Sequence, residues 1–260
     1  MIKRVLLFFV GILINFNLVA EAYIKTFDPG DEVNDSSNTS FIICVDPGHQ
    51  GKGDSRGESV APGSSNKKPR VSSGTAGVAT KRAEHIVNLE ASMILKELLL
   101  EKGYSVVMTR ETADVNISNA ERAEIANNAN ANMTIRVHCD SINDGGKTGA
   151  TILVPSKSSQ YTKDIYFESY KYAEILKQTL IDKNIKVNGI FERNDITGFN
   201  WSKVPVVILE MGFMSNYNED KMLSDHEYQR KLMECVTKAI DIYKERNWKV
   251  KVICLYIESN

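Results

Sequence analysis

The stretch FIICVDPGH, residues 41–49, decides the fold class of this 260-residue chain. Five consecutive apolar residues are typical of a short buried strand, and the Asp-Pro-Gly run that follows ends such a strand in a turn. The pattern therefore predicts a strand over 41–45, with His49 just past its carboxyl end. Buried strands of this length are usual in α/β domains, in which they alternate with helices.

Strand-like and helical segments do alternate after this stretch. Apolar residues at helical spacing predict a helix over 84–102, which a glycine ends, and a strand follows over 104–108. The pattern Ser-Asn-Ala-Glu at 118–121 is a capping box that begins a second helix. Further strands are predicted over 133–137, 150–154 and 204–209, and further helices over 164–183 and 226–246. The chain is therefore predicted to be α/β, a single layered domain with a mostly parallel, mixed twisted sheet flanked by helices.

The N-terminal segment has the composition of a targeting signal. Lys3 and Arg4 precede an almost wholly apolar run over 5–19, and Ala20-Glu21-Ala22 offers a small-residue cleavage site. We expect residues 1–22 to be a signal peptide and the product to be exported, either extracellular or associated with the cell wall. An uncleaved anchor is the alternative. No later run reaches eighteen apolar residues, so no stable membrane span is expected after cleavage.

Three further segments are predicted to lie outside the regular core. Residues 23–40 are polar and form a leader or spacer before the domain, whereas residues 51–80 are rich in Gly, Ser, Lys and Pro and read as a long loop beside a site. Residues 247–260 form a C-terminal tail of unknown role. Its run over 248–257 is strand-like in composition.

Charge and cysteine content exclude some classes of protein. The formal net charge of −1 provides no long-range attraction to nucleic acid or to anionic lipid. The four cysteines show no Cys-x-x-Cys spacing, and Cys44 and Cys139 lie beside apolar strand residues, which favours buried free thiols. A disulfide between these two is the less favoured alternative.

Two of the four histidines stand where an apolar strand gives way to a loop, in the segments IICVDPGH and MTIRVHCDS. Residues at the carboxyl ends of such strands converge despite large separations in sequence. With Glu84 at the start of a predicted helix, His49 and His138 offer a three-ligand set for a catalytic zinc, which leaves a fourth position open. The alternative reading is structural, because a Glu at a helix start complements the helix dipole and a lone strand-end His is seldom a ligand.

A second carboxylate interrupts the apolar segment KVPVVILEMGFMSN at Glu210. An unpaired buried carboxylate is costly, so this one needs a partner, a metal or a role in proton transfer. An ion pair at the edge of the core is the alternative. His85 would point about 100° away from Glu84 around the helix and is expected to be a bystander. His226, at a polar helix start, is expected at the surface.

Four segments together resemble the zinc N-acetylmuramoyl-L-alanine amidases of the autolysin and cell-separation type. They are VDPGHQG around His49, Glu84 with Asn88 one turn later, RVHCDS around His138, and PVVILEMGFMSN around Glu210. The resemblance spans residues 41–243 and extends to TRETAD and RAEIAN, to which it gives a structural role. The segment RNDITGFNWS, residues 193–202, is similar to clostridial-type autolysins.

The resemblance implies a catalytic domain over 41–246 that hydrolyses the amide between N-acetylmuramic acid and the L-alanine of the stem peptide in bacterial peptidoglycan. His49, Glu84 and His138 would bind one zinc ion per chain, and Glu210 would be the catalytic acid/base. Asn88 and Asn200 are the candidate substrate-binding residues. A partner protein that activates the enzyme is possible, and the sequence does not identify it.

Some features depart from the family pattern. Gln50 follows His49 where a second glycine is common, and the loop 51–80 is long and basic in places. These differences concern the shape of the substrate groove rather than the ligand set. The 260 residues contain none of the separate wall-binding repeats usual in the family, so targeting is expected to come from this domain, an anchor or a partner.

Two other functions would use similar residues. A non-catalytic peptidoglycan-binding module would retain the groove without turnover. The presence of all four candidate metal-binding and catalytic residues, His49, Glu84, His138 and Glu210, argues against it. A zinc carboxypeptidase acting on wall peptides would need an arginine that recognises the terminal carboxylate, and the sequence singles none out.

Overall fold

The computed structural model describes residues 41–258, with side chains described up to residue 247. The predicted signal peptide 1–22 and leader 23–40 lie outside the described residues.

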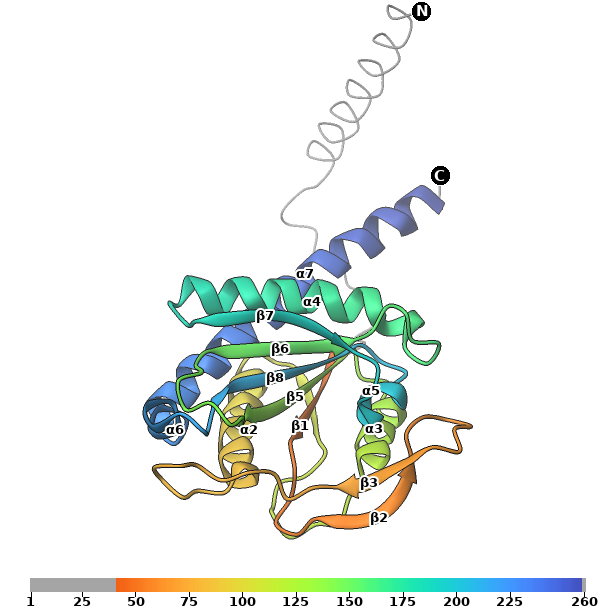
Figure 1. The fold of residues 1–260 in the computed structure, drawn as a ribbon. Coiled ribbons are helices and arrows are strands. Elements are labelled where there is room, and N and C mark those ends of the chain that lie inside the picture. The colour runs from red at the N-terminus through yellow and green to blue at the C-terminus, as the bar shows by residue number, and fades with distance from the viewer. Residues whose placement is uncertain (1–40, 259–260) are drawn as a thin grey trace, which may run out of the picture. The chain divides into compact units, whose positions relative to one another are not determined.

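Six strands form one sheet in the order β4-β1-β5-β8-β6-β7 (Figure 1). Four neighbours, β4, β1, β5 and β8, run parallel, whereas β6 is antiparallel to β8 and β7 is parallel to β6. The mostly parallel, mixed sheet is confirmed. The strand bounds are β1 Ile42–Pro47, β4 Ser105–Met108, β5 Met133–Asp140, β6 Ala150–Pro155, β7 Val187–Arg193 and β8 Val206–Phe213.

Helices cover both faces of this sheet. The main core lies on one face, where α2, α4 and α7 contribute most of the apolar side chains that meet the strands. On the other face, α3 and α5 pack against each other and complete two smaller apolar clusters. The helix bounds are α2 Glu84–Glu101, α3 Asn119–Asn128, α4 Lys163–Asp182, α5 Thr197–Asn200, α6 Tyr217–Leu223 and α7 His226–Glu258. Ser118 and Glu121 form the predicted capping box of α3.

The two faces of the sheet differ in polarity because side chains alternate along each strand. On β5, Ile135 and Val137 belong to the main core, whereas Arg136 and His138 point to the opposite face. On β1, Val45 faces the main core and the buried Asp46 faces away from it. One face is therefore a hydrophobic core, and the other gathers charged groups beneath the strand ends.

Two expectations about local structure are wrong, and one strand was missed. The segment 51–80 is not a plain loop, since it contains the antiparallel hairpin of β2 Asp54–Ser59 and β3 Lys67–Val71. These strands are mostly polar and exposed, so they lack the apolar run that marks a buried strand. Strand β7 was not expected. The tail over 248–257 continues α7 as a helix rather than forming a strand, because no Gly or Pro follows Tyr243 to end it.

Two smaller findings complete the fold. Cys44 and Cys139 are buried free thiols, as predicted, and so is Cys235. Among the described residues, none of the helices combines the length and the apolar character needed to cross a membrane.

Candidate metal centre

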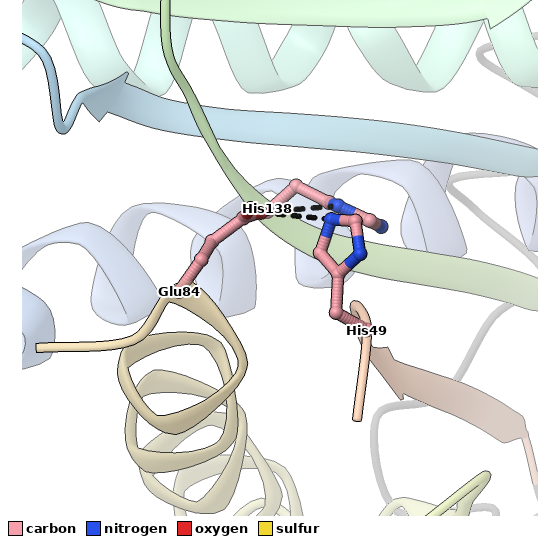
Figure 2. Close-up of side chains that lie close together, drawn as sticks. All are labelled: His49, Glu84 and His138. Carbon is pink, nitrogen blue, oxygen red and sulfur yellow. Dashed lines mark ion pairs between the residues drawn. The ribbon is translucent and has the colours of Figure 1, made fainter. Parts of the chain in front are cut away.

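Three elements bring His49, Glu84 and His138 together (Figure 2). Strands β1 and β5 are parallel neighbours, so the residues that end them meet at one edge of the sheet. His49 follows the end of β1, and His138 lies near the carboxyl end of β5. Glu84 is the first residue of α2, which packs against both strands. The topology thus assembles the three residues predicted as ligands.

One donor atom from each residue lies within 4.8 Å of the others. Oε1 of Glu84 is 3.1 Å from Nε2 of His49 and 3.5 Å from Nδ1 of His138. The two imidazole rings meet edge to face with their centroids 4.8 Å apart. The carboxylate is buried and both rings are half-buried. This spacing suits donors that share one small ion.

The charges around Glu84 also fit a divalent cation. Burial opposes ionisation of Glu84, but hydrogen bonds and charge interactions with His138 and His49 bring its pKa well below the usual range. Burial lowers the pKa of His138 to about 4, so this imidazole is neutral at pH 7. No Lys or Arg among the described side chains forms an ion pair with Glu84, and the buried Nε2 of His138 has no hydrogen-bond partner there. A buried carboxylate facing a neutral imidazole is the state in which such residues bind a metal.

Neighbouring groups orient the three side chains. Nδ1 of His49 lies 3.1 Å from the carbonyl oxygen of Ser72 and 2.9 Å from its hydroxyl, and Oε2 of Glu84 accepts from the amide of Thr75 at 3.0 Å. Oε1 of Glu84 accepts from the side chain of Asn88 at 3.1 Å and from the amide of Cys139 at 3.2 Å. Such contacts fix the ring orientation and the basicity of metal ligands.

Asp220 of α6 fixes the segment that leads into Glu84. Its buried carboxylate accepts from the amides of Ala79 and Thr80 and from the Thr80 hydroxyl, each at 2.7 Å. A Cβ at Gly77 would collide with this carboxylate, so the close approach requires glycine. Asp220 therefore holds the segment just before α2 in place.

Two glycines leave the room that His49, Glu84 and His138 occupy. A Cβ at Gly48 would collide with the ring of His138. Gly74 has a φ of +81°, and a Cβ there would lie 2.6 Å from Oε2 of Glu84 and 3.0 Å from the ring of His49. From the sequence, Gly48 was interpreted only as part of the turn that ends a strand, and Gly74 was not singled out.

Glu210 lies on β8 directly opposite His138 on β5. It is half-buried, and its Oε2 has no hydrogen-bond partner among the described residues. Burial and the nearby charge of Glu84 raise its pKa well above the usual range. The two carboxylates therefore have opposite environments, the pattern by which one site keeps one group ionised and another ready to exchange a proton.

The remaining candidates take other places. Asn88 is 0% exposed and its amide donates to Gly48 and Glu84, and Asn200 is 4% exposed and donates to the carbonyls of Val60 and Asn194. Neither amide is presented to a ligand at the surface, so their burial does not support the predicted contact with substrate. His85 lies outside the cluster, and His226 is exposed.

A layered α/β sheet that gathers two imidazoles and one carboxylate at one edge, with Glu210 on the next strand, has donor atoms that could hold a metal ion in a hydrolase. The family model of the N-acetylmuramoyl-L-alanine amidases matches residues 43–242, and the chain belongs to this family. The predicted family and enzyme class are confirmed: the chain is an amidase of the group that acts on cell-wall peptidoglycan.

Relatives and solved structures agree with this assignment. The chain is 25% identical to the N-acetylmuramoyl-L-alanine amidase Rv3717 of Mycobacterium tuberculosis over 208 residues, 77% of this chain and 85% of the relative. Its fold resembles that of the amidase Ami1 of Mycobacterium smegmatis, with a TM-score of 0.68, 24% identity, and coverage of 78% of this chain and 96% of the other. The amidase CwlD of Clostridioides difficile, solved in complex with the GerS lipoprotein, has a TM-score of 0.64, 23% identity, and coverage of 79% and 99%.

Proposed function

We propose that one zinc ion per chain, held by His49, Glu84 and His138, serves the hydrolysis of the amide between N-acetylmuramic acid and L-alanine in peptidoglycan. The observation that carries the proposal is the buried Glu84 carboxylate, which faces two imidazoles and no Lys or Arg side chain within ion-pair distance among the described residues. Two nitrogens and one oxygen form a usual set for catalytic zinc. Zinc bound there would polarise the amide carbonyl and make water acidic enough to attack at neutral pH.

Glu210 is the residue that we propose moves the proton. Its carboxylate would accept a proton from the attacking water and deliver it to the nitrogen of the departing L-alanine, which a peptide amide requires before it can leave. The raised pKa of Glu210 suits a group that must release its proton again. A nearby divalent charge would lower this pKa toward the range in which the group accepts a proton. Glu84 is held by hydrogen bonds from three partners and is not free for this task.

Peptidoglycan lies outside the cytoplasmic membrane, so this substrate agrees with the predicted export of the chain. We propose that the mature protein acts in or at the cell wall and reaches it through the signal in residues 1–22. The structural neighbour CwlD is in a complex with the GerS lipoprotein. An exported partner for this chain stays a prediction that a pull-down from the cell envelope would address.

Removal of the metal tests the cofactor. We expect a strong chelator to abolish hydrolysis of purified peptidoglycan and added zinc to restore it, since the motif residues include no obvious nucleophile of their own. Metal analysis of the zinc-loaded chain should find one ion per chain. Full activity in metal-free protein, or a folded chain that takes up no zinc, would contradict the proposal.

The products identify the bond that is cut. Mass spectrometry of digested peptidoglycan should find free stem peptides that begin with L-alanine, together with glycan strands of unchanged length. Shortened peptides still attached to muramic acid would instead indicate the carboxypeptidase alternative. Binding to peptidoglycan with no new products, in zinc-loaded protein, would indicate the non-catalytic binding module.

A further inference from the structure

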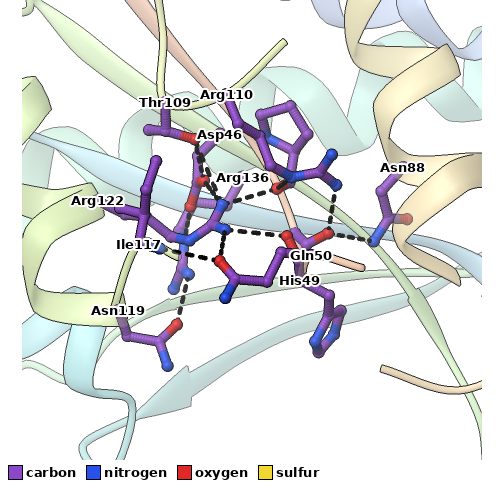
Figure 3. Close-up of polar contacts among 12 residues, drawn as sticks. Asp46, His49, Gln50, Asn88, Thr109, Arg110, Ile117, Asn119, Arg122 and Arg136 are labelled. Carbon is purple, nitrogen blue, oxygen red and sulfur yellow. Dashed lines mark hydrogen bonds and ion pairs between the residues drawn. The ribbon is translucent and has the colours of Figure 1, made fainter. Parts of the chain in front are cut away.

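The backbone at His49 adopts a conformation that needs support. Its φ is +62°, in the left-handed region, where the backbone conformation costs about 1–2 kcal/mol for a residue other than glycine. Such a conformation persists only when the surroundings hold it. In this turn the carbonyl oxygens of three consecutive residues, Pro47, Gly48 and His49, all accept hydrogen bonds from buried guanidinium groups (Figure 3).

Two arginines supply these donors. Arg122 donates to the carbonyls of Pro47 and His49, each at 2.9 Å. Arg110 donates from Nε to Pro47 and from Nη2 to Gly48, also at 2.9 Å. Both side chains are almost fully buried, at 2% and 3% exposed. The two arginines thus hold the turn that carries His49 by hydrogen bonds to all three of its carbonyl oxygens.

Arg110 also reaches the helix that carries the second ligand. Its Nη2 atom donates to the carbonyl of His85 at 2.8 Å, in addition to Gly48. These two acceptors are the sequence neighbours of Glu84 and of His49. A single nitrogen therefore joins the backbone beside one ligand to the backbone beside the other. Nη1 anchors the group to its own loop at Thr112, at 3.2 Å.

The charge of Arg110 is balanced differently from that of its neighbours. Arg122 and Arg136 form ion pairs with the buried Asp46, each at 2.7 Å. Arg110 forms no ion pair with any carboxylate among the described side chains, and its contacts are all backbone carbonyls. A buried cation without a carboxylate partner adds little to the stability of a fold. Its value lies in the segments that it holds together.

We infer that Arg110 is a positioning residue of the metal centre, which fixes the separation of His49 and Glu84 by tying their backbones to one planar group. The inference rests on the proposed function, since it takes these two residues to be metal ligands. Lysine at this position would keep the charge, but its single ammonium cannot reproduce a planar fork that reaches three segments of chain. Loss of such an outer contact weakens metal binding by roughly 10- to 100-fold.

The test is the zinc affinity of the full chain, measured by competition with a chromophoric chelator, for the parent and for Arg110→Lys. We expect the zinc dissociation constant to rise by roughly 10- to 100-fold in Arg110→Lys, and the lost activity to return at excess zinc. Arg136→Lys is the matched control, because Arg136 lies in the same buried cluster but its contacts are with Asp46 and Asn119 rather than with the His49 turn. This control should cost stability yet bind zinc as the parent does.

The outcomes separate the two proposals. If the parent binds zinc but Arg110→Lys binds it equally well, or if Arg136→Lys loses as much affinity, the positioning role is overturned and the proposed function stands. If the parent binds no zinc, the proposed function is overturned and this inference with it. Should Arg110→Lys be partly unfolded, the competition is repeated in sucrose, which favours the folded state, so that the affinity still refers to folded protein.

Discussion

At the scale of single residues, two carboxylates beside the same histidines differ because of what surrounds them. Glu84 accepts hydrogen bonds from two backbone amides and from Asn88, and its pKa is lowered. Oε2 of Glu210 is buried and has no hydrogen-bond partner within residues 41–247, and the pKa of Glu210 is raised. The proposed roles, metal binding for Glu84 and proton transfer for Glu210, therefore rest on the environment of each carboxylate rather than on residue type.

Glu210→Gln should separate catalysis from metal binding. Glutamine keeps the size of the side chain and removes the base, so turnover should fall by roughly 10²- to 10⁴-fold while zinc stays bound. Steady-state rates and metal analysis on the same preparation check both parts. Near-normal turnover in this variant would mean that the base lies elsewhere, and His85 would be the first residue to test.

Glu84→Gln should behave in the opposite way. A neutral amide oxygen is a poorer donor to zinc than a carboxylate, so the variant should lose its metal to a weak chelator sooner than the parent. Part of its activity should return at high zinc concentration. If the variant kept zinc as tightly as the parent but lost turnover, the roles proposed for Glu84 and Glu210 would have to be exchanged.

At the scale of elements, the strand ends were the predictable part of the site. Short apolar runs before His49, His138 and Glu210 identify β1, β5 and β8, and parallel strands must bring their carboxyl ends to one edge. The polar hairpin β2–β3 and strand β7 were not predictable, because exposed strands lack that signal. Nor were the outer contacts of Ser72, Asp220 and Arg110, since hydrogen bonds between distant segments leave no local pattern.

The buried Asp46 joins β1 to α3 and to β5 through Arg122 and Arg136. Burial opposes its ionisation, but the two guanidiniums and the Thr109 hydroxyl bring its pKa well below the usual range. Asp46→Asn leaves two buried cations uncompensated and should lower the free energy of unfolding by about 3–5 kcal/mol. Urea unfolding at pH 7 measures this difference.

The pH dependence provides the control for Asp46. Because the folded-state pKa is lowered, the stabilisation is present above the unfolded-state pKa, about 3.9, and is lost as the pH falls below it. The gap in stability between the parent and Asp46→Asn should therefore be constant near neutral pH and narrow on acidification below pH 4. A gap that is absent at pH 7 would show that the ion pairs contribute no net stability.

At the scale of the whole molecule, composition and local pattern predicted the class of fold but not the strand order. Alternating strands and helices indicate a layered α/β domain, and the six-stranded sheet has that form. Strand β6 pairs antiparallel with β8 and parallel with β7, so the strand direction reverses at β6. That is a property of the assembled sheet, and no single segment carries it.

The last prediction concerns the exported form of the chain, and it tests where the protein acts. Ala20 and Ala22 are the small residues that a signal peptidase reads, so the mature chain should begin at Tyr23. N-terminal sequencing of protein recovered from the cell wall or the medium decides the point. The near-neutral charge provides no separate attraction to anionic lipid, so a cleaved chain should not stay with the membrane. Recovery of the full-length chain in the membrane fraction would show instead that residues 5–19 anchor it, and its access to peptidoglycan would then be limited to the wall nearest the membrane.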